Sequence, residues 1–464
     1  MKRILLVQAY NGREEFQRTI FPLGLCYIAT ALADKHNVKI FDPNLCGDNP
    51  YSKLAEKIMD FKPDILALSI RNIDTCDKKD IFYYYKTVPV TIKLMKEKMP
   101  DATIVVGGSG FSIFAREIMD RIRDIDLGVY LEAEETFPEL IEKLDRPQEV
   151  KGLYYRKDGE ILFTGLRPLP DFENLPMPRK DFVDMNRYPN PLFNVGIQTK
   201  RGCPLRCAHC SYPFLNGNKV RMRSPKKVVD EIEYHVKEFG VREFMFVDGV
   251  FNVPEKHAEE ICNEIIRRGI DVNWAAWCEI KHFSEEFLIL ARKAGCRTIG
   301  FSPDAMSDEA LNLLGKDISS KDIEKAFRLI IKHRGVNANF GFFCTPPGQT
   351  IRGVFSTIYM YFKINALMLS KGGAAMGWIR IEPHTRMEQI ALKQGYITKD
   401  MDLLPEKEED LKALFYTSKP FWMADRLVES ILWLVNSLVI PALKTMKILL
   451  RLLTPARSKE RSDL

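Results

Sequence analysis

The sequence predicts an α/β protein in three parts: a doubly wound, Rossmann-like N-terminal domain, a partial (βα)6 barrel of the TIM type and a helical C-terminal region. Two stretches predict this fold, because short apolar runs alternate with amphipathic segments in both of them. Apolar strands separated by helices are typical of a parallel sheet that is covered on both faces. The 464 residues, of which 46% are hydrophobic and 28% charged, are enough for two or three domains.

The first domain is expected to span residues 1–148. Its apolar runs predict five strands: Arg3–Gln8, Val38–Phe41, Ile65–Ser69, Thr103–Val106 and Leu127–Tyr130. The amphipathic segments between them predict helices that include Leu23–Asp34, Tyr85–Lys98 and Phe111–Arg121. Doubly wound domains bind ligands at the carboxyl ends of their parallel strands, so we expect a binding site there.

Residues 149–192 are expected to form a hairpin and a linker. Tyr154–Phe163 has the pattern of two paired strands, and Asp158-Gly159 at its centre tolerates the positive φ angles of a tight turn. Proline interrupts regular structure, and six prolines follow the hairpin: Pro168, Pro170, Pro176, Pro178, Pro189 and Pro191.

The alternation of strands and helices resumes between residues 193 and 398. Six strands are predicted: Asn194–Thr199, Glu243–Val247, Asn273–Trp277, Thr298–Phe301, Asn339–Cys344 and Gly377–Ile381. Six strand–helix units indicate an open or partial βα barrel. In such barrels the chemistry takes place at the carboxyl ends of the strands.

Residues 399–464 are expected to be helical, and Phe421–Leu453 is rich in apolar residues. The most apolar piece ends at Pro441 and is shorter than the roughly 20 residues that span a bilayer. Basic residues alternate with apolar ones beyond it: Lys444, Lys447, Arg451, Arg457 and Lys459. Two interpretations stay open, an amphipathic segment that rests on a membrane surface and a helix pair that packs across the barrel mouth.

Composition and charge narrow the class of protein. The net charge of +6 comes without a basic stripe between aromatic residues, so nucleic acid is not an expected partner. The N-terminal apolar run is too short for a signal peptide, which favours the reducing cytoplasm. Clustered cysteines in that compartment indicate metal binding or catalysis rather than disulfides. Seven of the ten cysteines stand alone, and we interpret each of these as a small buried hydrophobe.

Three cysteines are clustered. Cys203, Cys207 and Cys210 have the spacing Cys-x3-Cys-x2-Cys just after the first predicted barrel strand. Three thiolates bind three irons of a 4Fe–4S cluster and leave the fourth iron free for the amino and carboxylate groups of a ligand such as methionine. A structural zinc ion needs four ligands, usually from two separated pairs, and His209 lies too near its neighbours in sequence to be the fourth. A chance grouping of three buried cysteines is a further alternative.

One carboxylate follows the second predicted barrel strand. Asp248 comes directly after an apolar run, where a carboxylate can bind the ammonium group or the ribose of a cofactor. A turn or a helix N-cap is the other interpretation of this residue.

The cysteine motif resembles that of the radical S-adenosylmethionine (SAM) superfamily, in which an aromatic residue precedes the third cysteine and His209 takes that place here. The resemblance implies that SAM binds the open iron. An external flavodoxin- or ferredoxin-type donor then supplies the electron that splits SAM into methionine and a 5′-deoxyadenosyl radical. It also implies SAM contacts at the later strand ends, from Ser302, where the superfamily often has Glu-Ser, and from Thr345 in a proline-glycine loop. A plain turn is the other interpretation of that loop. His384 stands where the family has glycine in a Pro-Gly-Thr element, and a structural and a catalytic role stay open for it.

A doubly wound domain before such a barrel resembles the cobalamin-binding class of that superfamily. Four segments that follow strands or open helices carry the resemblance: Phe21–Ala29, Ser69–Asp74, Val106–Ser112 and Glu132–Phe137. The resemblance implies contacts to cobalamin from six of their residues: Asn72, Asp74, Gly107, Gly108, Ser109 and Glu132. Glycines at a strand end let the backbone approach a flat cofactor closely, and a tight strand–helix turn is the alternative reason for them.

The sequence departs from the class at two places. Leu131 and Ala133 replace both glycines of the family's Gly-Glu-Gly-Glu element. The Asp-x-His-x-x-Gly motif of many cobalamin proteins is also missing, because Lys39 stands where glycine is needed after Asp34-Lys35-His36. The lower face of cobalamin is therefore expected to meet the loop Arg71–Asp74 without a histidine ligand.

The sequence and the resemblance together predict a cobalamin-dependent radical SAM enzyme that methylates an unactivated carbon. Two alternatives stay open: a radical rearrangement, cyclisation or oxidation with cobalamin as an electron relay, and a non-catalytic cobalamin or iron–sulfur sensor. The apolar C-terminal region is compatible with a hydrophobic substrate such as a lipid, or with a simple lid over a small-molecule site.

Overall fold

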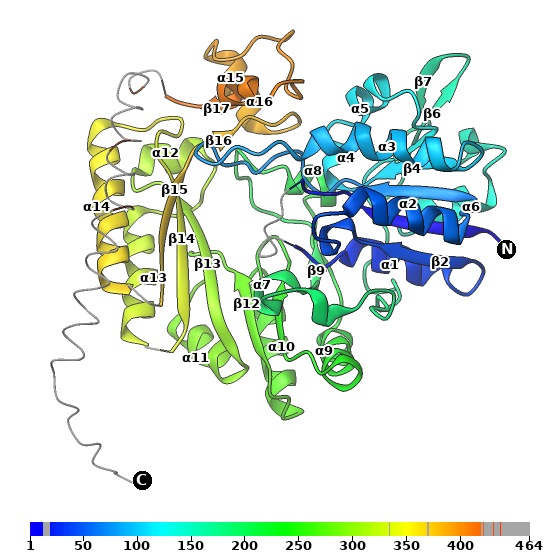
Figure 1. Ribbon diagram of the computed structural model, residues 1–464. Helices are drawn as coiled ribbons and strands as arrows, with labels where there is room; N and C mark the ends of the chain where they lie inside the picture. Colours follow the sequence, from blue (N-terminus) through cyan, green and yellow to red (C-terminus); the bar gives the residue numbers. More distant parts are fainter. Residues whose placement is uncertain are drawn as a thin grey trace.

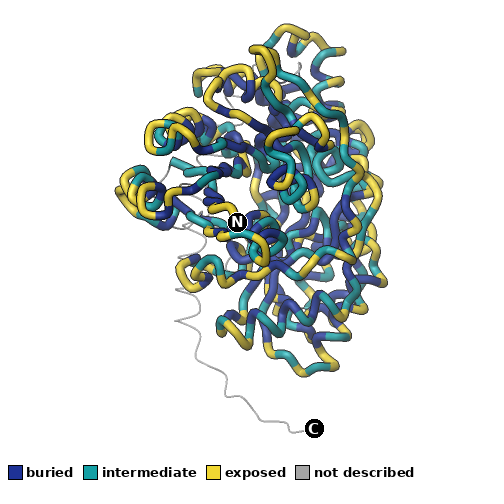
Figure 2. The backbone as a smooth tube through the Cα atoms, turned by 90° about the vertical axis from the view of Figure 1, so that its right-hand side faces the viewer, coloured by how far each residue is buried: buried dark blue, intermediate teal, exposed yellow. Residues whose placement is uncertain are grey.

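The computed structural model describes residues 1–12, 19–333, 335–368 and 371–418, together with Phe421, Ser430 and Ser437. Two largely parallel sheets with their helices stand side by side, the N-terminal one on the right of Figure 1 and the barrel-like one on the left. Figure 2 shows buried residues along the inner strands and exposed ones on the outer turns of helices and loops. The predicted α/β class with two parallel sheets is confirmed.

Seven strands form the N-terminal sheet, in the order β2-β1-β3-β4-β5-β6-β7. The first five are parallel and lie where the apolar runs predict them: β1 (Arg3–Gln8), β2 (Asn37–Phe41), β3 (Ile65–Ser69), β4 (Thr103–Gly107) and β5 (Leu127–Val129). Successive side chains of a strand point to opposite faces, so Ile4 and Leu6 enter one core and Leu5 and Val7 the other. The covering helices are α1 (Leu23–Leu32) and α6 (Thr136–Glu142) on the first face and α2 (Pro50–Phe61), α3 (Thr87–Lys98), α4 (Ser109–Ile113) and α5 (Ala115–Arg121) on the second.

One predicted helix differs from the observed structure. The segment Phe111–Arg121 was expected to be continuous, but it is split between α4 and α5 at Phe114, whose φ and ψ angles are −127° and 35°. The ring of Phe114 is 2% exposed and belongs to the core on this face. Packing of one large side chain thus interrupts the helix where neither glycine nor proline marks a break.

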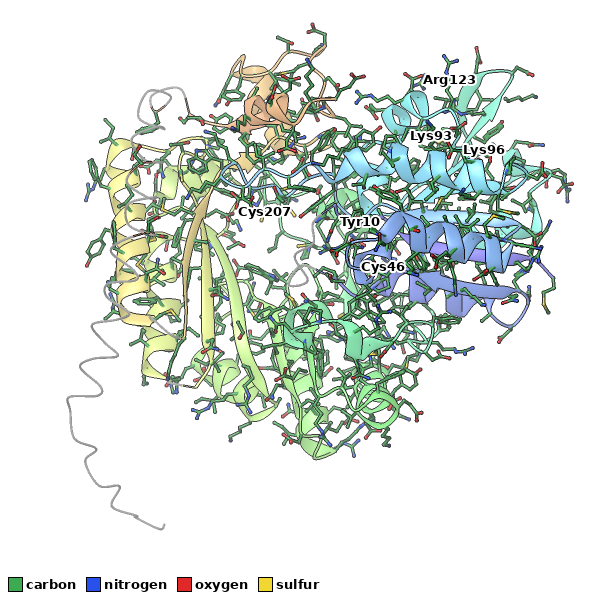
Figure 3. The ribbon with its side chains drawn as sticks, in the orientation of Figure 1. Tyr10, Cys46, Lys93, Lys96, Arg123 and Cys207 are labelled. Atoms are coloured by element: carbon green, nitrogen blue, oxygen red, sulfur yellow. The ribbon has the colours of Figure 1, made fainter. Side chains whose placement is uncertain are left out.

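The carboxyl ends of the N-terminal strands face the barrel part. Tyr10 follows β1 and Cys46 lies beyond β2, and both are on the side of this domain that looks toward Cys207 (Figure 3). Lys96 at the end of α3 and Arg123 lie on the far side of the domain in the same view. The predicted ligand edge is therefore directed at the cysteine loop.

The hairpin and the linker tie the two parts together. Strands β6 (Leu153–Lys157) and β7 (Glu160–Phe163) extend the first sheet, and the turn between them has positive φ at Asp158 (51°) and Gly159 (82°), as the sequence predicts. The linker that follows is packed rather than free, since Lys180 is fully buried and its Nζ lies 2.8 Å from Glu231 Oε1 of the barrel part.

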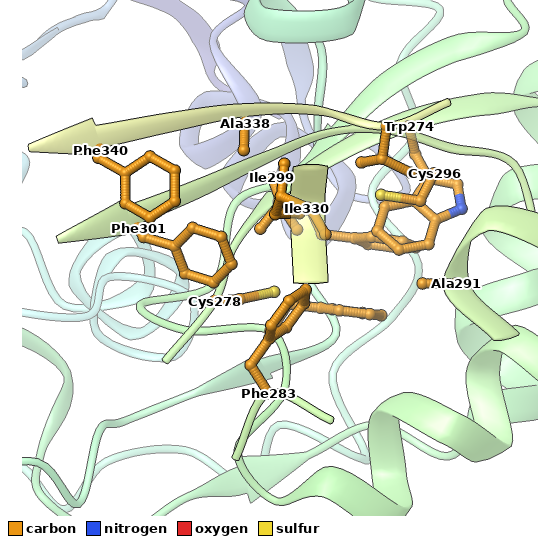
Figure 4. Close-up of a cluster of buried hydrophobic side chains, with 14 of the residues drawn as sticks. Trp274, Cys278, Phe283, Ala291, Cys296, Ile299, Phe301, Ile330, Ala338 and Phe340 are labelled. Atoms are coloured by element: carbon orange, nitrogen blue, oxygen red, sulfur yellow. The ribbon is translucent and has the colours of Figure 1, made fainter. Parts of the chain in front are cut away.

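The barrel part is an open sheet of six parallel strands, in the order β15-β14-β13-β12-β11-β8. Its strands are β8 (Gly196–Ile197), β11 (Glu243–Phe246), β12 (Asn273–Trp277), β13 (Cys296–Asp304), β14 (Asn337–Phe343) and β15 (Gly372–Gly377). Its main helices are α9 (Pro225–Phe239), α10 (Glu255–Arg267), α11 (Glu285–Lys293), α12 (Asp308–Leu313), α13 (Ser320–Lys332) and α14 (Ile351–Met368). Figure 4 shows part of the core between them, where the rings of Phe283 and Phe301 meet edge to face at 4.9 Å.

The prediction for the sixth strand was wrong. Gly377–Ile381 was expected there, but the strand that pairs with β14 is β15, which begins at Gly372. Ile379–Arg380 forms β16, which pairs with β17 (Phe415–Tyr416) in a separate antiparallel ladder. β15 reads Gly-Gly-Ala-Ala-Met-Gly and has no β-branched or aromatic residue, so its strand state comes from its neighbour β14 and not from propensity.

Five of the seven lone cysteines are buried, as expected: Cys26, Cys262, Cys278, Cys296 and Cys344. Cys46 is half-buried and Cys76 is exposed, so the interpretation as a buried hydrophobe was wrong for Cys76. Cys76 lies in the long loop after β3, which reaches toward the barrel part, and not in a core.

The described end of the chain packs between the two parts. The segment contains α15 (Arg386–Lys393) and the short α16 (Glu408–Leu411), and its apolar side chains join the core of α2 to α5. Most of the predicted helical segment Phe421–Leu453 lies outside the described residues. Among the described helices, none combines the length and the apolar character that crossing a bilayer requires.

Candidate functional site

The cysteine loop follows a short strand, and its start is held by backbone contacts. Strand β9 (Lys200–Arg201) pairs with β10 (Arg221–Met222), and Gly202 comes next with a φ angle of +84°. A Cβ on Gly202 would lie 2.1 Å from the carbonyl oxygen of Lys219, so only glycine can hold this conformation. The amide of Cys203 donates to Gly217 O at 3.1 Å. The loop shape is thus set by the backbone before any metal binds.

The three thiols share one environment. Cys203 is buried, and Cys207 and Cys210 are half-buried. Burial raises the pKa of all three and brings that of Cys210 to about 12, and the negative charges of Cys203 and Cys207 add to this rise. Such thiols stay protonated at neutral pH unless a soft metal takes the place of the protons. Three sulfur donors from one loop suit the irons of a cluster.

The thiols are not arranged for one ion. In the part of the chain that the structure describes, no three His, Cys, Asp or Glu side chains are grouped so that they could hold a single metal ion. His209 does not turn toward a shared metal with its neighbours, because its ring meets Phe343 edge to face at 4.9 Å. Burial lowers the pKa of His209, so the ring is neutral at pH 7.

A buried cation lies beside Cys207. Lys316 Nζ is 2.8 Å from Asp304 Oδ2 and donates to Ser302 O at 2.8 Å. Burial opposes the charge of Lys316, but the charges of Asp304 and Cys207 outweigh it and raise the pKa of Lys316. The Glu279 carboxyl is near both Lys316 and Cys207, and burial raises its pKa. Sequence reasoning missed both residues. Glu279 comes shortly after strand β12, which was the available signal, whereas Lys316 follows helix α12 and its sequence position gave no such signal.

The predicted contacts at the strand ends have different surroundings. Asp248 is 5% exposed and is already engaged, because it accepts from the amides of Thr199 (2.8 Å) and Lys200 (3.2 Å) and forms an ion pair with Lys200 Nζ at 3.3 Å. It therefore holds the strand that leads into the cysteine loop. Ser302 is exposed near the end of β13.

The loop after β14 has free hydrogen-bonding groups. Thr345 is 2% exposed, and in the described chain its Oγ1 has no partner. Gln349, 5% exposed, has neither amide atom satisfied there. Buried polar groups are normally paired, so these atoms are suited to a polar ligand such as a nucleobase or a ribose. His384 has a φ angle of +64°. Its ring stacks on that of Phe214, a residue that follows the cysteine loop, with ring centroids 4.2 Å apart.

The N-terminal edge presents a recess at the ends of β1 and β3. Its volume is about 70 Å³, and Tyr10, Asn44, Arg71, Asn72 and Tyr84 are among the residues that line it. The Arg71 side chain is accessible to solvent, but it lines the recess and protein surrounds it there. This surrounding protein lowers the pKa of Arg71 by desolvation. Asn72 is exposed in the same loop.

The glycines after β4 pack two loops together. Gly107 ends β4 and Gly108 has a φ angle of +95°, and a Cβ on Gly108 would lie 2.5 Å from Ile70 O. Ser109 Oγ then donates to Arg71 O at 2.6 Å. The turn therefore needs glycine in order to bring the β4 loop against the β3 loop, which fixes the surface that both loops present to the barrel.

Glu132 and Asp74 form ion pairs with the barrel part. Glu132 Oε2 is 2.8 Å from Arg201 Nη1 and Glu134 Oε1 is 2.5 Å from Arg201 Nη2, while Arg221 also pairs with Glu132. We call the group of Arg201, Glu132, Glu134 and Arg221 the interdomain clamp. Because Arg201 directly precedes Gly202 and Cys203, the clamp joins the N-terminal edge to the cysteine loop.

A second buried ion pair crosses the same boundary. Asp74 Oδ2 lies 3.1 Å from Arg380 Nε, and both side chains are at most 5% exposed. His36, from the incomplete cobalamin motif, lies just before β2 and bonds to the amide of Lys2, so it is at the opposite edge of the sheet.

A doubly wound domain whose ligand edge faces three cysteines on a partial barrel defines an iron–sulfur enzyme with a second cofactor domain. Comparison with protein families specifies the class. The model of the Radical SAM superfamily matches residues 197–358, and the model of the B12 binding domain matches residues 13–141. The chain belongs to the cobalamin-binding class of the radical SAM superfamily, whose cofactors are a 4Fe–4S cluster, SAM and cobalamin.

Relatives of known sequence include methyltransferases and cyclases. An uncharacterised methyltransferase of Pyrococcus horikoshii is 29% identical over 74% of this chain and 73% of its own length. The anaerobic magnesium-protoporphyrin IX monomethyl ester cyclase of Rubrivivax gelatinosus is 27% identical over 72% of this chain, but the match spans only 61% of that protein.

Solved structures confirm the arrangement of the fold. The radical SAM methyltransferase TsrM from Kitasatospora setae has a TM-score of 0.73 at 23% identity, over 85% of this chain and 76% of its own. The cobalamin-dependent SAM radical enzyme OxsB has a TM-score of 0.70 at 17% identity, over 90% of this chain and 64% of its own. At these identities the likeness shows the fold alone.

Proposed function

We propose that the chain transfers a methyl group from SAM, by way of cobalamin, to an unactivated carbon of an organic small molecule. The observation that carries the proposal is the interdomain clamp, because it directs the ligand edge of the N-terminal domain at the cysteine loop. When both cofactors are bound, the cluster would supply the electron that splits SAM, and cobalamin would carry the methyl group.

Residues of the barrel part would hold the cluster and SAM. Cys203, Cys207 and Cys210 would hold three irons of the cluster. Lys316 and Glu279, one cationic and one acidic, would face the carboxylate and ammonium groups of the methionine part. Further contacts to SAM are proposed for His209, Ser302, Thr345 and Gln349.

The corrin ring would lie between the domains. The 70 Å³ recess is far smaller than a corrin, so we place the ring across its mouth, against Asn72 and Ser109 and without a histidine ligand. We assign Asp248, Asp74 and Glu132 to positioning, since their carboxylates already form ion pairs or hydrogen bonds with the protein. The proposed parts are residues 1–148 for cobalamin, 149–192 as the connection, 193–398 for SAM and the cluster, and 399–464 as a C-terminal region.

The proposed partners are an external flavodoxin- or ferredoxin-type electron donor and a small-molecule substrate, with a hydrophobic substrate favoured by the apolar C-terminal region. A radical cyclisation or oxidation is the second candidate, because three of the relatives found are cyclases. Both reactions consume SAM, but only methyl transfer moves its methyl carbon into the product. We extend the proposal to peripheral contact between the chain and a membrane surface.

The test is anaerobic turnover with methyl-deuterated SAM. Protein reconstituted with iron, sulfide and cobalamin is reduced with dithionite and mixed with candidate substrate extracts. The proposal expects both 5′-deoxyadenosine and a product whose mass includes the deuterated methyl group. 5′-Deoxyadenosine with an unlabelled product would favour the cyclase alternative, and no cleavage by protein with a full cluster would contradict both.

A further inference from the structure

Helix α14 is apolar on two faces. Its inner face is buried in the barrel core through Val354, Tyr361 and Ile364, among others. Its outer face nevertheless has four large apolar side chains that are mostly exposed: Ile351 (67%), Phe355 (68%), Tyr359 (62%) and Leu367 (54%). Positions four residues apart lie close together on a helix, so Ile351, Phe355 and Tyr359 form one stripe on the first half of this helix of about 27 Å. Leu367 lies further along, past Lys363 and about 160° around the helix from Ile351.

This stripe is unusual for a surface helix. Helices that cover a core normally turn polar and charged residues outward. Single exposed apolar residues such as Ile266 and Ile289 occur elsewhere on the barrel helices and need no explanation. A continuous apolar surface marks a binding surface instead.

The stripe borders a groove on a helix at the outer margin of the barrel part. The groove, with a volume of about 670 Å³, lies between α13 and α14 and is lined by Phe355, Tyr359, Arg352 and Glu324, among others. α14 leads into β15, the edge strand of the barrel sheet, whereas the other edge strand, β8, is on the side of the N-terminal domain. Figure 1 shows α14 at the outer left margin, remote from that domain.

The charges around the stripe are mostly positive. α14 has no acidic residue and contributes Arg352 and Lys363, and Lys363 Nζ lies 5.5 Å above the ring of Tyr359. α13 adds four exposed bases: Lys321, Lys325, Arg328 and Lys332. Two of these bases are paired with acids, Arg328 with Glu324 and Lys332 with Glu285, each at 2.7 Å. Asp322 caps α13 and Glu309 is near Arg352, so the basic rim consists mainly of Lys321, Lys325, Arg352 and Lys363.

We propose that the outer face of α14 docks on an anionic lipid surface. An apolar stripe with a basic rim is the composition of helices that lie in the interface of a bilayer, where lysine and arginine reach the headgroups. The charge disfavours two other occupants. A second copy would bring two basic rims together, and residues 422–464 of this chain are also net basic, with seven Lys or Arg against four Asp or Glu.

The test uses the full chain and vesicles. Protein is sedimented with vesicles of phosphatidylcholine alone or mixed with phosphatidylglycerol, and the bound fraction is compared for wild type, Phe355→Glu and Arg352→Glu. The matched control is Ile266→Glu, at a residue of α10 that is 41% exposed. We expect binding to mixed vesicles that falls with salt, a loss of roughly tenfold in Phe355→Glu, a smaller loss in Arg352→Glu and none in the control.

Three outcomes would overturn the proposal. The first is equal sedimentation of Phe355→Glu and wild type. The second is faster tryptic cleavage beyond residue 421 in Phe355→Glu with unchanged vesicle binding, because the stripe would then cover the chain's own end. The third is a change of oligomeric state in Phe355→Glu without vesicles. Vesicle binding needs neither cofactors nor substrate, so its failure would leave the proposed methyl transfer untouched.

Discussion

Single residues around the cysteines act through backbone conformation and charge as much as through sulfur. Gly202 adopts a conformation that its neighbours deny to any other residue, and Lys316 keeps a positive charge in a buried place beside Cys207. Neither residue is proposed as a metal ligand. Both nevertheless set the conditions under which a cluster can form and be reduced.

Replacement of Gly202 by alanine should prevent the loop from closing. The left-handed backbone alone costs roughly 1–3 kcal/mol for a residue with a Cβ, and the contact with Lys219 O adds to it. Iron per chain after anaerobic reconstitution should fall strongly. Gly240→Ala is the control, because Gly240 also has positive φ (+67°) but no atom within 4 Å of its Cβ position, so it should keep its iron. Full iron loading of Gly202→Ala would contradict this role of the glycine.

Removal of the charge of Lys316 should affect stability and redox potential together. In Lys316→Met the buried Asp304 carboxylate loses its partner, which costs about 3–5 kcal/mol in the free energy of unfolding. Lys316→Met/Asp304→Asn should recover most of that loss. Lys316→Met should have a cluster with a lower reduction potential than wild type, since a cation beside the sulfur favours the reduced state. The double variant removes one charge of each sign, so its potential should lie closer to that of wild type. An unchanged potential in a folded, cluster-loaded Lys316→Met would exclude this role of Lys316.

At the scale of elements, the strands were predictable and their junctions were not. Apolar runs located the N-terminal strands within a residue or two, because buried parallel strands leave a direct trace in sequence. β15 left no such trace, since a strand of glycine and alanine depends on its neighbour β14. The cysteine motif was also recognisable from the sequence. The pairing of Glu132 with Arg201 was not, because the two residues are 69 positions apart and only the folded chain brings them together.

The linker is joined to α9 by an ion group that should give the protein an acid-sensitive step. Glu231 is fully buried beside Lys180 and Arg223. Burial alone would raise the pKa of Glu231, but the two cations outweigh burial and lower this pKa from an ordinary 4.5 to about 2. A carboxylate with a depressed folded-state pKa stabilises the fold fully above pH 4.5, and this stabilisation is lost as the pH falls toward 2. The lowered pKa of Glu231 contributes roughly 3 kcal/mol to the free energy of unfolding.

Urea unfolding between pH 6 and pH 2 can measure this step, with wild type compared with Glu231→Gln. The variant should be less stable at pH 6, because Lys180 and Arg223 lose their partner, and should show a flatter decline toward low pH. Parallel curves for the two proteins would mean that another group is responsible for the acid sensitivity.

At the scale of the whole molecule, two cofactor domains must be held at a fixed distance for their chemistry to be coupled. The interdomain clamp and the pair Asp74–Arg380 are buried ion pairs at that boundary, and the packed linker adds a third connection. Buried pairs are sensitive to the loss of one partner, so the boundary should respond to small changes.

Glu132→Gln/Glu134→Gln should uncouple the two domains. The three cysteines are unchanged, so SAM cleavage should continue, whereas transfer of the labelled methyl group should fall by at least about tenfold as the domains lose their alignment. Glu142→Gln, which breaks the exposed pair with Lys35, is the control and should change neither activity. A parallel loss of cleavage and transfer in the clamp variant would indicate general destabilisation instead.

The proposed chemistry depends on an iron that the protein leaves open for SAM. Electron paramagnetic resonance of the reconstituted, dithionite-reduced protein tests this directly when spectra are recorded with and without SAM. We predict a 4Fe–4S signal whose shape changes when SAM is added and that is absent from Cys203→Ala/Cys207→Ala/Cys210→Ala. A cluster signal that SAM leaves unchanged, or a reconstituted protein that holds zinc in place of iron, would contradict the central claim.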